Sequence, residues 1–257
     1  MNKSALPLVS IVTPVFNSER FIKETIQSVI NQSYQNWEHI LVDDCSSDNS
    51  TNIIKEYTTI DPRIKFFKLD RNSGSGPARN LAIKIAQGRY IAFIDSDDVW
   101  IPDKLKRQVN FMLEKDCAVC HASYGYIDET GKEIRRPYLV SSNPVEYKYL
   151  LKRTDISCLT AMFDQDKIGK FYMPKLRRKQ DYGLWLNILR VGNISVPYNR
   201  NEILAYYRQH SGSATSNKRV LITKHYFFLR NHEKLSRVNS LKYTCYWIIG
   251  GVKKHFV

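Results

Sequence analysis

The stretch LVSIVTPVFNSERFIKETIQSVINQSYQNWEHILVDD (residues 8–44) decides the fold, because it holds a complete strand–helix–strand unit. Residues 8–16 are rich in β-branched side chains, which favour a buried strand. Apolar residues then recur at helical spacing and predict a helix over residues 19–32. The run in residues 37–46 predicts a second strand. Two strands joined through a helix indicate a parallel pair.

The same alternation continues along the chain. We predict helices over residues 48–58, 76–88 and 102–115 and strands over residues 64–69, 89–95 and 117–127. We expect Gly88 to close the helix over residues 76–88 as a C-cap glycine. Strands that alternate with helices predict an α/β fold with a mostly parallel central sheet flanked by helices.

The composition of the chain limits its expected cellular location and binding partners. The chain has 257 residues and a formal net charge of +14, so its expected partners are nucleic acid, anionic lipid or a polyanionic substrate. No apolar run approaches the roughly 20 residues of a membrane-spanning helix, and the first residues lack the apolar core of a signal peptide. The five cysteines suit reduced thiols. Cys117 and Cys120, beside His121, lack the further ligands of a zinc site. We expect a cytoplasmic protein.

Acidic residues gather where the predicted strands end. Asp43 and Asp44 follow one strand, and the D-x-D sequence Asp95-Ser96-Asp97 follows another. In open α/β sheets, ligands bind outside the carboxyl ends of the strands. Clustered carboxylates repel one another and need solvent, a helix N-terminus or a cation. Carboxylates suit Mg²⁺ and Mn²⁺, whereas the alternative is a solvated loop ahead of the next helix.

A glycine-rich segment, SGSGPARN (residues 73–80), precedes the third predicted helix. It is only weakly similar to a dinucleotide-binding loop, because it does not follow the first strand and lacks a third glycine. The helix N-terminus and Arg79 suit an anion. A structural role for Arg79 is an equal alternative from spacing alone.

Four segments together resemble the family 2 glycosyltransferases. They are residues 9–50, residues 72–105 with the D-x-D sequence, RRKQDYGLWLNIL (residues 177–189) and YRQHSGSATSNK (residues 207–218). They occur in the family's order and span most of the chain. The likeness is greatest to bacterial members that build surface polysaccharides such as O-antigen, capsule or teichuronic acid. It implies a GT-A fold over residues 1–216, in which a Rossmann-like nucleotide-binding half joins an acceptor-binding half.

The resemblance also implies a donor site for a UDP-sugar. Phe16 would lie against the base, Asp44 would hydrogen-bond it, and Asp95 would face the ribose. A capped turn is the alternative role for Asp43 and Asp44. The implied nucleotide-sugar residues are Pro14, Phe16, Glu19, Asp43, Asp44, Arg79, Asp95, Ser96 and Arg208.

The implied metal ligands are Asp97 and His210, with Mn²⁺ or Mg²⁺ bridging the two phosphates of the donor. Arg208 and His210 would approach the diphosphate or the metal as a lid. A lone histidine is also often structural. The resemblance further implies a metal-dependent hexosyltransferase that inverts the sugar's configuration.

Asp181 is the implied general base. Apolar residues at helical spacing follow it, so a stabilising carboxylate at the start of a helix is the alternative role. The chain departs from the family pattern at Gln180, where many members have Glu, and at Thr215, where Ser is more frequent.

The C-terminal segment, residues 217–257, differs in composition from the rest. It carries nine basic residues and one acidic residue among many aromatic ones. We predict a helical extension that lies on an anionic membrane surface. A tail that packs its aromatic residues on the domain is the alternative. The implied acceptor is a saccharide of the undecaprenyl-diphosphate-linked kind, and the implied location is the inner face of the plasma membrane.

Two other functions remain open from the residues. A sugar-nucleotide pyrophosphorylase would need a Gly-rich, Arg-containing loop after the first strand, where this chain has TPVFNSER (residues 13–20). A non-catalytic basic protein that binds RNA or membrane would leave the ordered carboxylates unexplained, and no RNA-binding motif is present. We therefore expect no nucleic-acid partner.

Overall fold

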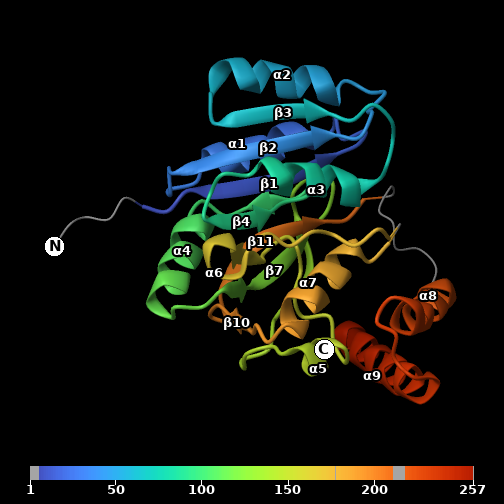
Figure 1. Ribbon diagram of the computed structural model, residues 1–257. Helices are drawn as coiled ribbons and strands as arrows, with labels where there is room; N and C mark the ends of the chain where they lie inside the picture. Colours follow the sequence, from blue (N-terminus) through green and yellow to red (C-terminus); the bar gives the residue numbers. More distant parts are fainter. Residues whose placement is uncertain (1–5, 177, 211–217, 257) are drawn as a thin grey trace.

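The computed structural model describes residues 6–176, 178–210 and 218–256. The first half alternates strands and helices as predicted (Figure 1). Its elements are β1 (Val9–Val15), α1 (Ile22–Ile30), β2 (Trp37–Asp43), α2 (Ser50–Ile60), β3 (Ile64–Lys68), α3 (Ser75–Ile85), β4 (Tyr90–Phe93), β5 (Val99–Trp100) and α4 (Lys104–Glu114).

The second half contains shorter strands and the C-terminal helices. Its elements are β6 (Val119–His121), β7 (Ser123–Ile127), β8 (Glu133–Tyr138), α5 (Tyr147–Leu150), β9 (Met162–Asp164), α6 (Gln165–Ile168), α7 (Gln180–Arg190), β10 (Ser195–Pro197), β11 (Ile203–Arg208), α8 (Lys218–Asn231) and α9 (Arg237–Phe256).

The central sheet has seven strands in the order β10-β6-β9-β4-β1-β2-β3. The pairs β1–β2, β1–β4, β2–β3 and β6–β10 are parallel, whereas β9 runs antiparallel to both β4 and β6. A second sheet has the order β5-β11-β7-β8. The predicted α/β fold with a mostly parallel, mixed central sheet is confirmed.

Side chains on the two faces of the central sheet enter two separate cores. Ile11 of β1 packs in the core that contains residues of α1 and α4, whereas Val12 packs in the core that contains residues of α3 and α7. This separation follows from the period of two along a strand. Each fully buried aliphatic side chain stabilises the fold by roughly 1.5–3 kcal/mol. Helices on both faces leave the sheet's carboxyl edge as the place for a ligand.

Two details differ from the sequence predictions. The single strand predicted over residues 117–127 is two strands, β6 and β7, which belong to different sheets. Ala122 lies between them. Its backbone N–H donates to the Thr160 hydroxyl and its carbonyl oxygen accepts from that hydroxyl, so a side chain provides the hydrogen bonds that a neighbouring strand would otherwise make. Gly88 is not a C-cap, because α3 ends at Ile85. A Cβ atom at Gly88 would lie 2.6 Å from the carbonyl oxygen of Leu8, so glycine is required by close backbone approach.

Helices α8 and α9 pack against each other and against earlier parts of the chain (Figure 1). Phe228 of α8 meets Tyr182 of α7, with ring centroids 5.3 Å apart. Trp247 of α9 donates a hydrogen bond to the Thr154 hydroxyl at 3.2 Å. Within the residues that the structure describes, no helix is both long enough and apolar enough to cross a bilayer.

Candidate active site

Parallel register brings the ends of β1, β2 and β4 to one edge of the central sheet. Val15 pairs with Asp43 across β1 and β2, and Val12 pairs with Phe93 across β1 and β4. The segments that follow these strands are therefore neighbours. The hydroxyl oxygens of Ser18 and Ser96 lie 2.6 Å apart, which links the first predicted donor segment directly to the D-x-D sequence.

Asp43, the last residue of β2, and Asp44, which follows it, are buried and hydrogen-bonded to nearby backbone. Asp43 accepts from the backbone N–H of Ser46 at 3.1 Å and from the Thr51 hydroxyl at 3.2 Å, so it caps the following turn. The two carboxylate oxygens of Asp44 accept from the backbone N–H groups of Ser73 and Gly74 at 2.6 Å each. Asp44 thereby ties the end of β2 to the start of α3, and its contact with a base stays a prediction.

The segment after β1 presents one aromatic ring to solvent. Phe16 is 50% exposed, whereas Pro14 is buried within β1. The next residue, Asn17, takes the left-handed conformation with φ of 48°. Glu19 accepts a hydrogen bond from the backbone N–H of Asn49 at 2.9 Å, which holds this turn against the start of α2. Phe16 is thus available to a planar ligand.

The D-x-D sequence is held by a buried arginine. The Arg79 guanidinium lies 2.5 Å from Oδ1 of Asp95, and Arg79 is nine-tenths buried. Burial opposes the charge of Arg79, but the charge and hydrogen bond of Asp95, together with nearby Cys158 and Asp181, raise the arginine's pKa. Arg79 also lies in the first half of α3, as predicted for a residue near an anion site. The structure therefore brings Arg79 and Asp95, which were predicted separately as donor-site residues, into contact.

Asp97 and His210 also meet. The Nε2 atom of His210 lies 3.0 Å from Oδ2 of Asp97. Burial raises the pKa of Asp97, as does the charge of Asp95, and His210 partly offsets both effects. The remainder of the predicted closing segment, residues 211–217 with Thr215, lies outside the described residues.

Arg208 is buried behind the loop that carries Asp97 and Asp98 and already has protein partners. Its side chain donates to the backbone oxygen of Asp97 at 2.8 Å and forms an ion pair with Glu24 at 2.5 Å. Its backbone N–H donates to Oδ1 of Asp98 at 2.9 Å. Its predicted approach to a diphosphate stays a prediction.

The sequence reasoning did not place Glu24 or Asp98 in this network. Burial raises the pKa of Asp98 well above its usual range, and the charge of Asp97 adds to this effect. The signal for Asp98 was present as the last carboxylate of Asp95-Ser96-Asp97-Asp98. Glu24 gave no signal, because its partner is distant in the chain.

The residues of this edge suit a divalent metal only in part. Nowhere in the described ranges do three or more His, Cys, Asp or Glu side chains converge on one point. Asp97 and His210 offer one carboxylate and one imidazole. Mg²⁺ and Mn²⁺ sites commonly use one or two protein ligands, with substrate phosphates and water completing the set. The pair therefore fits a metal that is bound together with a nucleotide diphosphate.

Asp181 lies in the first turn of α7 and is half-buried. The start of α7 packs on the start of α3, because Ser75 donates to the side-chain oxygen of Gln180 at 3.0 Å. A Cβ atom at Gly76 would lie 3.0 Å from the Gln180 side chain, which explains the small residue there. The Asp181 carboxylate is close enough to raise the pKa of Arg79. The candidate base therefore stands beside the D-x-D edge.

Lys179, immediately before α7, is a further residue that the sequence reasoning missed. It takes the left-handed conformation with φ of 60°, and its ammonium group bonds to Nδ1 of His225. Burial lowers the pKa of Lys179 to about 7, although the charge of Asp181 opposes the shift. The backbone of the α7 start is thereby anchored to α8.

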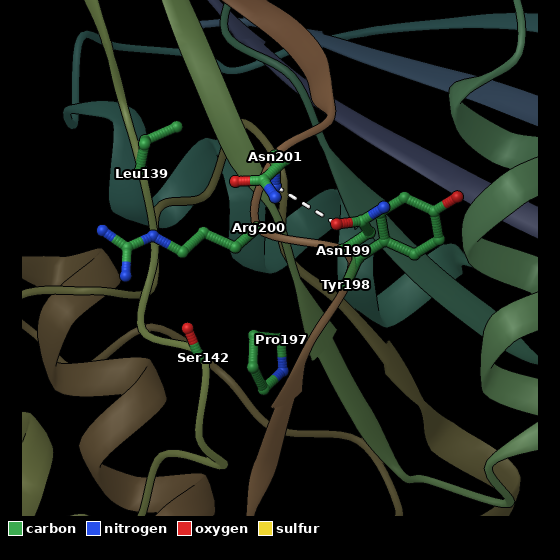
Figure 2. A pocket seen from close by; sticks show the side chains of 7 residues that line it. All are labelled: Leu139, Ser142, Pro197, Tyr198, Asn199, Arg200 and Asn201. Atoms are coloured by element: carbon green, nitrogen blue, oxygen red, sulfur yellow. Dashed lines mark hydrogen bonds between the residues drawn. The ribbon is translucent and has the colours of Figure 1, made fainter.

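A polar cavity lies elsewhere on the molecule, around the end of β10 (Figure 2). Its volume is about 520 Å³, and Figure 2 shows Arg200 and Ser142 among its lining side chains. The backbone N–H of Asn201 donates to the side chain of Asn199 at 3.2 Å. None of the predicted donor, metal or base residues lines this cavity, so it is separate from the D-x-D edge.

Comparison with known proteins agrees with this architecture. The family model described as "Glycosyl transferase family 2" matches residues 10–182. TuaG of Bacillus subtilis (strain 168), a glycosyltransferase provisionally named for teichuronic acid biosynthesis, is 42% identical over 89% of this chain and 90% of its own. WfgD of Escherichia coli, a UDP-Glc:alpha-D-GlcNAc-diphosphoundecaprenol beta-1,3-glucosyltransferase, is 37% identical over 96% of this chain and 95% of its own.

Solved structures share the fold at lower identity. Staphylococcus aureus TarS (residues 1–349 of that protein) in complex with UDP-GlcNAc has a TM-score of 0.70 and 22% identity, over 92% of this chain and 70% of that one. Mannosyltransferase PcManGT from Pyrobaculum calidifontis, in complex with GDP-Man and Mn²⁺, has a TM-score of 0.64 and 16% identity, over 90% of this chain and 64% of that one.

Proposed function

The chain belongs to glycosyl transferase family 2, and from this premise we propose that it is an inverting, metal-dependent hexosyltransferase that uses a UDP-sugar. Its acceptor is a hydroxyl group of a saccharide carried on undecaprenyl diphosphate, and its product enters a bacterial surface polysaccharide. The single observation that carries the proposal is the meeting of the Arg79–Asp95 and Asp97–His210 pairs at one sheet edge, and the contact between the starts of α3 and α7 supports a role for Asp181 there. Because the chain belongs to this family, we no longer consider the pyrophosphorylase or the RNA-binding function.

The donor site runs along the carboxyl edge of the sheet. Phe16 offers an exposed ring for the uracil base, and Asp43 and Asp44 shape the turn beneath it. Asp95 and Ser96 face the ribose, while Arg79 supplies positive charge toward the diphosphate. The name of WfgD, which specifies UDP-Glc, supports UDP-glucose as the first donor to test.

Asp97 and His210 are the residues that would hold Mn²⁺ or Mg²⁺. When bound, such an ion neutralises the negative charge that develops on the departing diphosphate. The Mn²⁺ in the PcManGT complex supports this assignment by fold alone. Arg79 adds a fixed positive charge beside Asp95, and Arg208 positions the loop that carries Asp97.

Asp181 acts as the general base. It removes the proton from the acceptor hydroxyl as that oxygen attacks the anomeric carbon from the face opposite the diphosphate. The carbon–oxygen bond to the diphosphate breaks, and the sugar passes through an oxocarbenium-like transition state with inversion. Burial lowers the pKa of Lys179 to about 7, so this lysine carries less than a full positive charge at neutral pH, two residues before Asp181.

The C-terminal helices supply the contact with the membrane, at the inner face of the plasma membrane. We treat residues 217–257 as an extension of the transferase domain. Helix α9 exposes the apolar side chains Val238, Leu241 and Ile249 beside basic Lys242. An exposed apolar stripe with basic neighbours suits the interface of an anionic leaflet.

The direct test is transfer from UDP-glucose to GlcNAc-diphosphate-lipid with Mn²⁺ present, followed by mass spectrometry and determination of the anomeric configuration. We expect a β-linked product that is formed with Mn²⁺ and lost with EDTA. Full transfer in EDTA would overturn metal dependence, and retention of configuration would overturn the role of Asp181. Other UDP-sugars in parallel decide which hexose is used.

A further inference from the structure

A second cavity, of about 510 Å³, lies between the segment that precedes α7 and one face of α8. Leu176, Leu221 and Phe227 line it with apolar groups, and Arg178, Lys179 and Lys224 add basic groups. In the described part of the chain, no acidic residue lines this cavity. Its volume is within the range of small-molecule sites. The lining therefore combines an apolar wall with exclusively positive charge.

This cavity adjoins the candidate base. Lys179 lines the cavity and directly precedes α7, in whose first turn Asp181 lies. Burial lowers the pKa of Lys179 at the cavity wall and the Asp181 carboxylate opposes this shift, while the same carboxylate adds to the raised pKa of Arg79 at the D-x-D edge. Asp181 is thus within electrostatic reach of both places. An acceptor whose hydroxyl meets Asp181 is therefore close to Lys179, which lies two residues earlier and lines this cavity.

Lys179, on the wall of the cavity, is fixed by side-chain contacts, whereas two other basic residues that line the cavity are exposed. Lys179 is enclosed by His225 and by the ring of Trp247, whose centroid lies 4.7 Å from its ammonium nitrogen. His225 and Trp247 stack with centroids 4.5 Å apart. Arg178 and Lys224 are exposed, and no ion pair between described residues involves either of them. Both cations are therefore available to an external anion.

We propose that this cavity binds the diphosphate and the first isoprenyl units of the lipid-linked acceptor. Arg178 and Lys224 contact the diphosphate oxygens, and Leu221 and Phe227 contact the hydrocarbon. The inference rests on the proposed function, because it requires a lipid-linked acceptor. A free sugar or nucleotide would leave Phe227, 53% exposed on α8, without an apolar partner. An isoprenyl diphosphate matches both the charge and the apolar wall.

The test uses farnesyl diphosphate, which has both chemical parts but no sugar, and titrates it into the UDP-loaded protein by calorimetry. Inorganic pyrophosphate and farnesol serve as half-probes. We expect farnesyl diphosphate to bind at least about tenfold more tightly than either half, because each half loses either the ion pairs or the apolar contact. Equal binding of pyrophosphate and farnesyl diphosphate would overturn the apolar part of the site.

Matched variants locate the binding. Lys224→Glu and Phe227→Ser should each weaken farnesyl diphosphate binding by roughly tenfold or more. Lys106→Glu and Ile60→Ser change exposed residues of α4 and α2 that do not line the cavity, and they should leave this binding unchanged. If the control variants lose as much farnesyl diphosphate affinity as the cavity variants, the binding reflects general charge and apolar attraction. That result would overturn the proposal that this cavity is the binding site.

UDP titration and UDP-glucose hydrolysis separate this inference from the proposed function. If the parent protein binds UDP normally but does not bind farnesyl diphosphate, the proposed role of the cavity is wrong and the proposed function is unaffected. Failure to bind UDP or to turn over any UDP-sugar would overturn the proposed function, even where farnesyl diphosphate binds. Phosphatidylglycerol vesicles without diphosphate lipid should not compete with farnesyl diphosphate for the cavity.

Discussion

The imidazole of His210 lies 3.0 Å from the carboxylate of Asp97, although 113 residues separate the two in the chain. This contact follows from the anchoring of β11. Tyr206 of β11 pairs with Val99 of β5, and the backbone of Arg208 donates to Asp98. The end of β11 is therefore fixed against the D-x-D loop, and His210 follows two residues later. A metal ligand role for both side chains requires this arrangement.

Asp97→Asn should weaken Mn²⁺-dependent UDP binding by at least about 10- to 100-fold, because it removes a charged oxygen ligand. Calorimetric UDP titration with Mn²⁺ and with EDTA measures the difference. Asp70→Asn, an exposed change away from the network, is the control. Unchanged Mn²⁺ dependence in Asp97→Asn would remove this residue from the metal site.

Asp181→Asn should reduce sugar transfer by about 10²- to 10⁴-fold, the usual contribution of a general base. UDP affinity should stay within about twofold, since the donor binds along the strand ends. The free energy of unfolding should fall by no more than roughly 1 kcal/mol, because the carboxylate also favours the helix N-terminus. A transfer assay is paired with urea denaturation. Near-normal sugar transfer by this variant would mean that Asp181 is not the general base and only stabilises the start of α7.

Arg208→Lys distinguishes the two roles of that residue. Its guanidinium bonds to backbone oxygens and Glu24 simultaneously, and an ammonium group cannot reproduce these contacts. We expect a loss of stability of roughly 1–3 kcal/mol, since the backbone oxygens that the guanidinium contacts lose their donors. Thermal unfolding with and without UDP measures it. Unchanged stability with a large loss of UDP affinity would instead support direct diphosphate binding.

Lys104→Met should stabilise the protein at neutral pH by on the order of 1 kcal/mol. Lys104 is fully buried, lies 3.9 Å from the Trp100 ring centroid, and has no hydrogen bond to its ammonium group among the described residues. Burial lowers its pKa to about 7. Lys106→Met, on the exposed side of α4, is the control and should have little effect.

The same lysine predicts the direction of the pH dependence. In the unfolded chain a lysine titrates near pH 10.4, so between pH 7 and that value the unfolded state binds more protons. Lys104 therefore contributes a rise in the free energy of unfolding with pH across this window, and Lys104→Met should remove that contribution. Lys179, whose pKa is also lowered to about 7, contributes in the same direction, whereas the buried thiols of Cys117 and Cys120, whose pKa values burial raises, oppose it above about pH 8. Urea denaturation at pH 7, 8 and 9 measures both; an unchanged slope would contradict a neutral Lys104.

Leu241→Ser combined with Ile249→Ser should weaken binding to phosphatidylglycerol vesicles severalfold and leave the fold cooperative, because both side chains are exposed on α9. Ile60→Ser, an exposed aliphatic change on α2, is the matched control. Vesicle sedimentation and thermal unfolding are the two measurements. Equal vesicle binding by the double variant and the control would exclude α9 as the membrane contact.

Local patterns in the sequence predicted the elements of the first half. Side-chain periods of 2 and 3.6 are local properties, so β1, α1, β2 and β4 were recognisable from short segments. The prediction for Gly88 was wrong because a glycine near a helix end can be either a C-cap or a site of close backbone approach. Only the position of the Leu8 carbonyl oxygen in the structure distinguishes the two roles. The strand predicted over residues 117–127 failed similarly, since sheet membership depends on partners such as Thr160.

For the site, the chain itself determined which residue types stand at the strand ends, and family resemblance indicated their roles. Only the tertiary structure decided which of them touch: Arg79 with Asp95, Asp97 with His210, and Arg208 with Glu24. The same holds for Lys179, enclosed by α8 and α9 beside Asp181. Contacts between distant segments depend on register, packing and burial, which no local stretch of sequence contains.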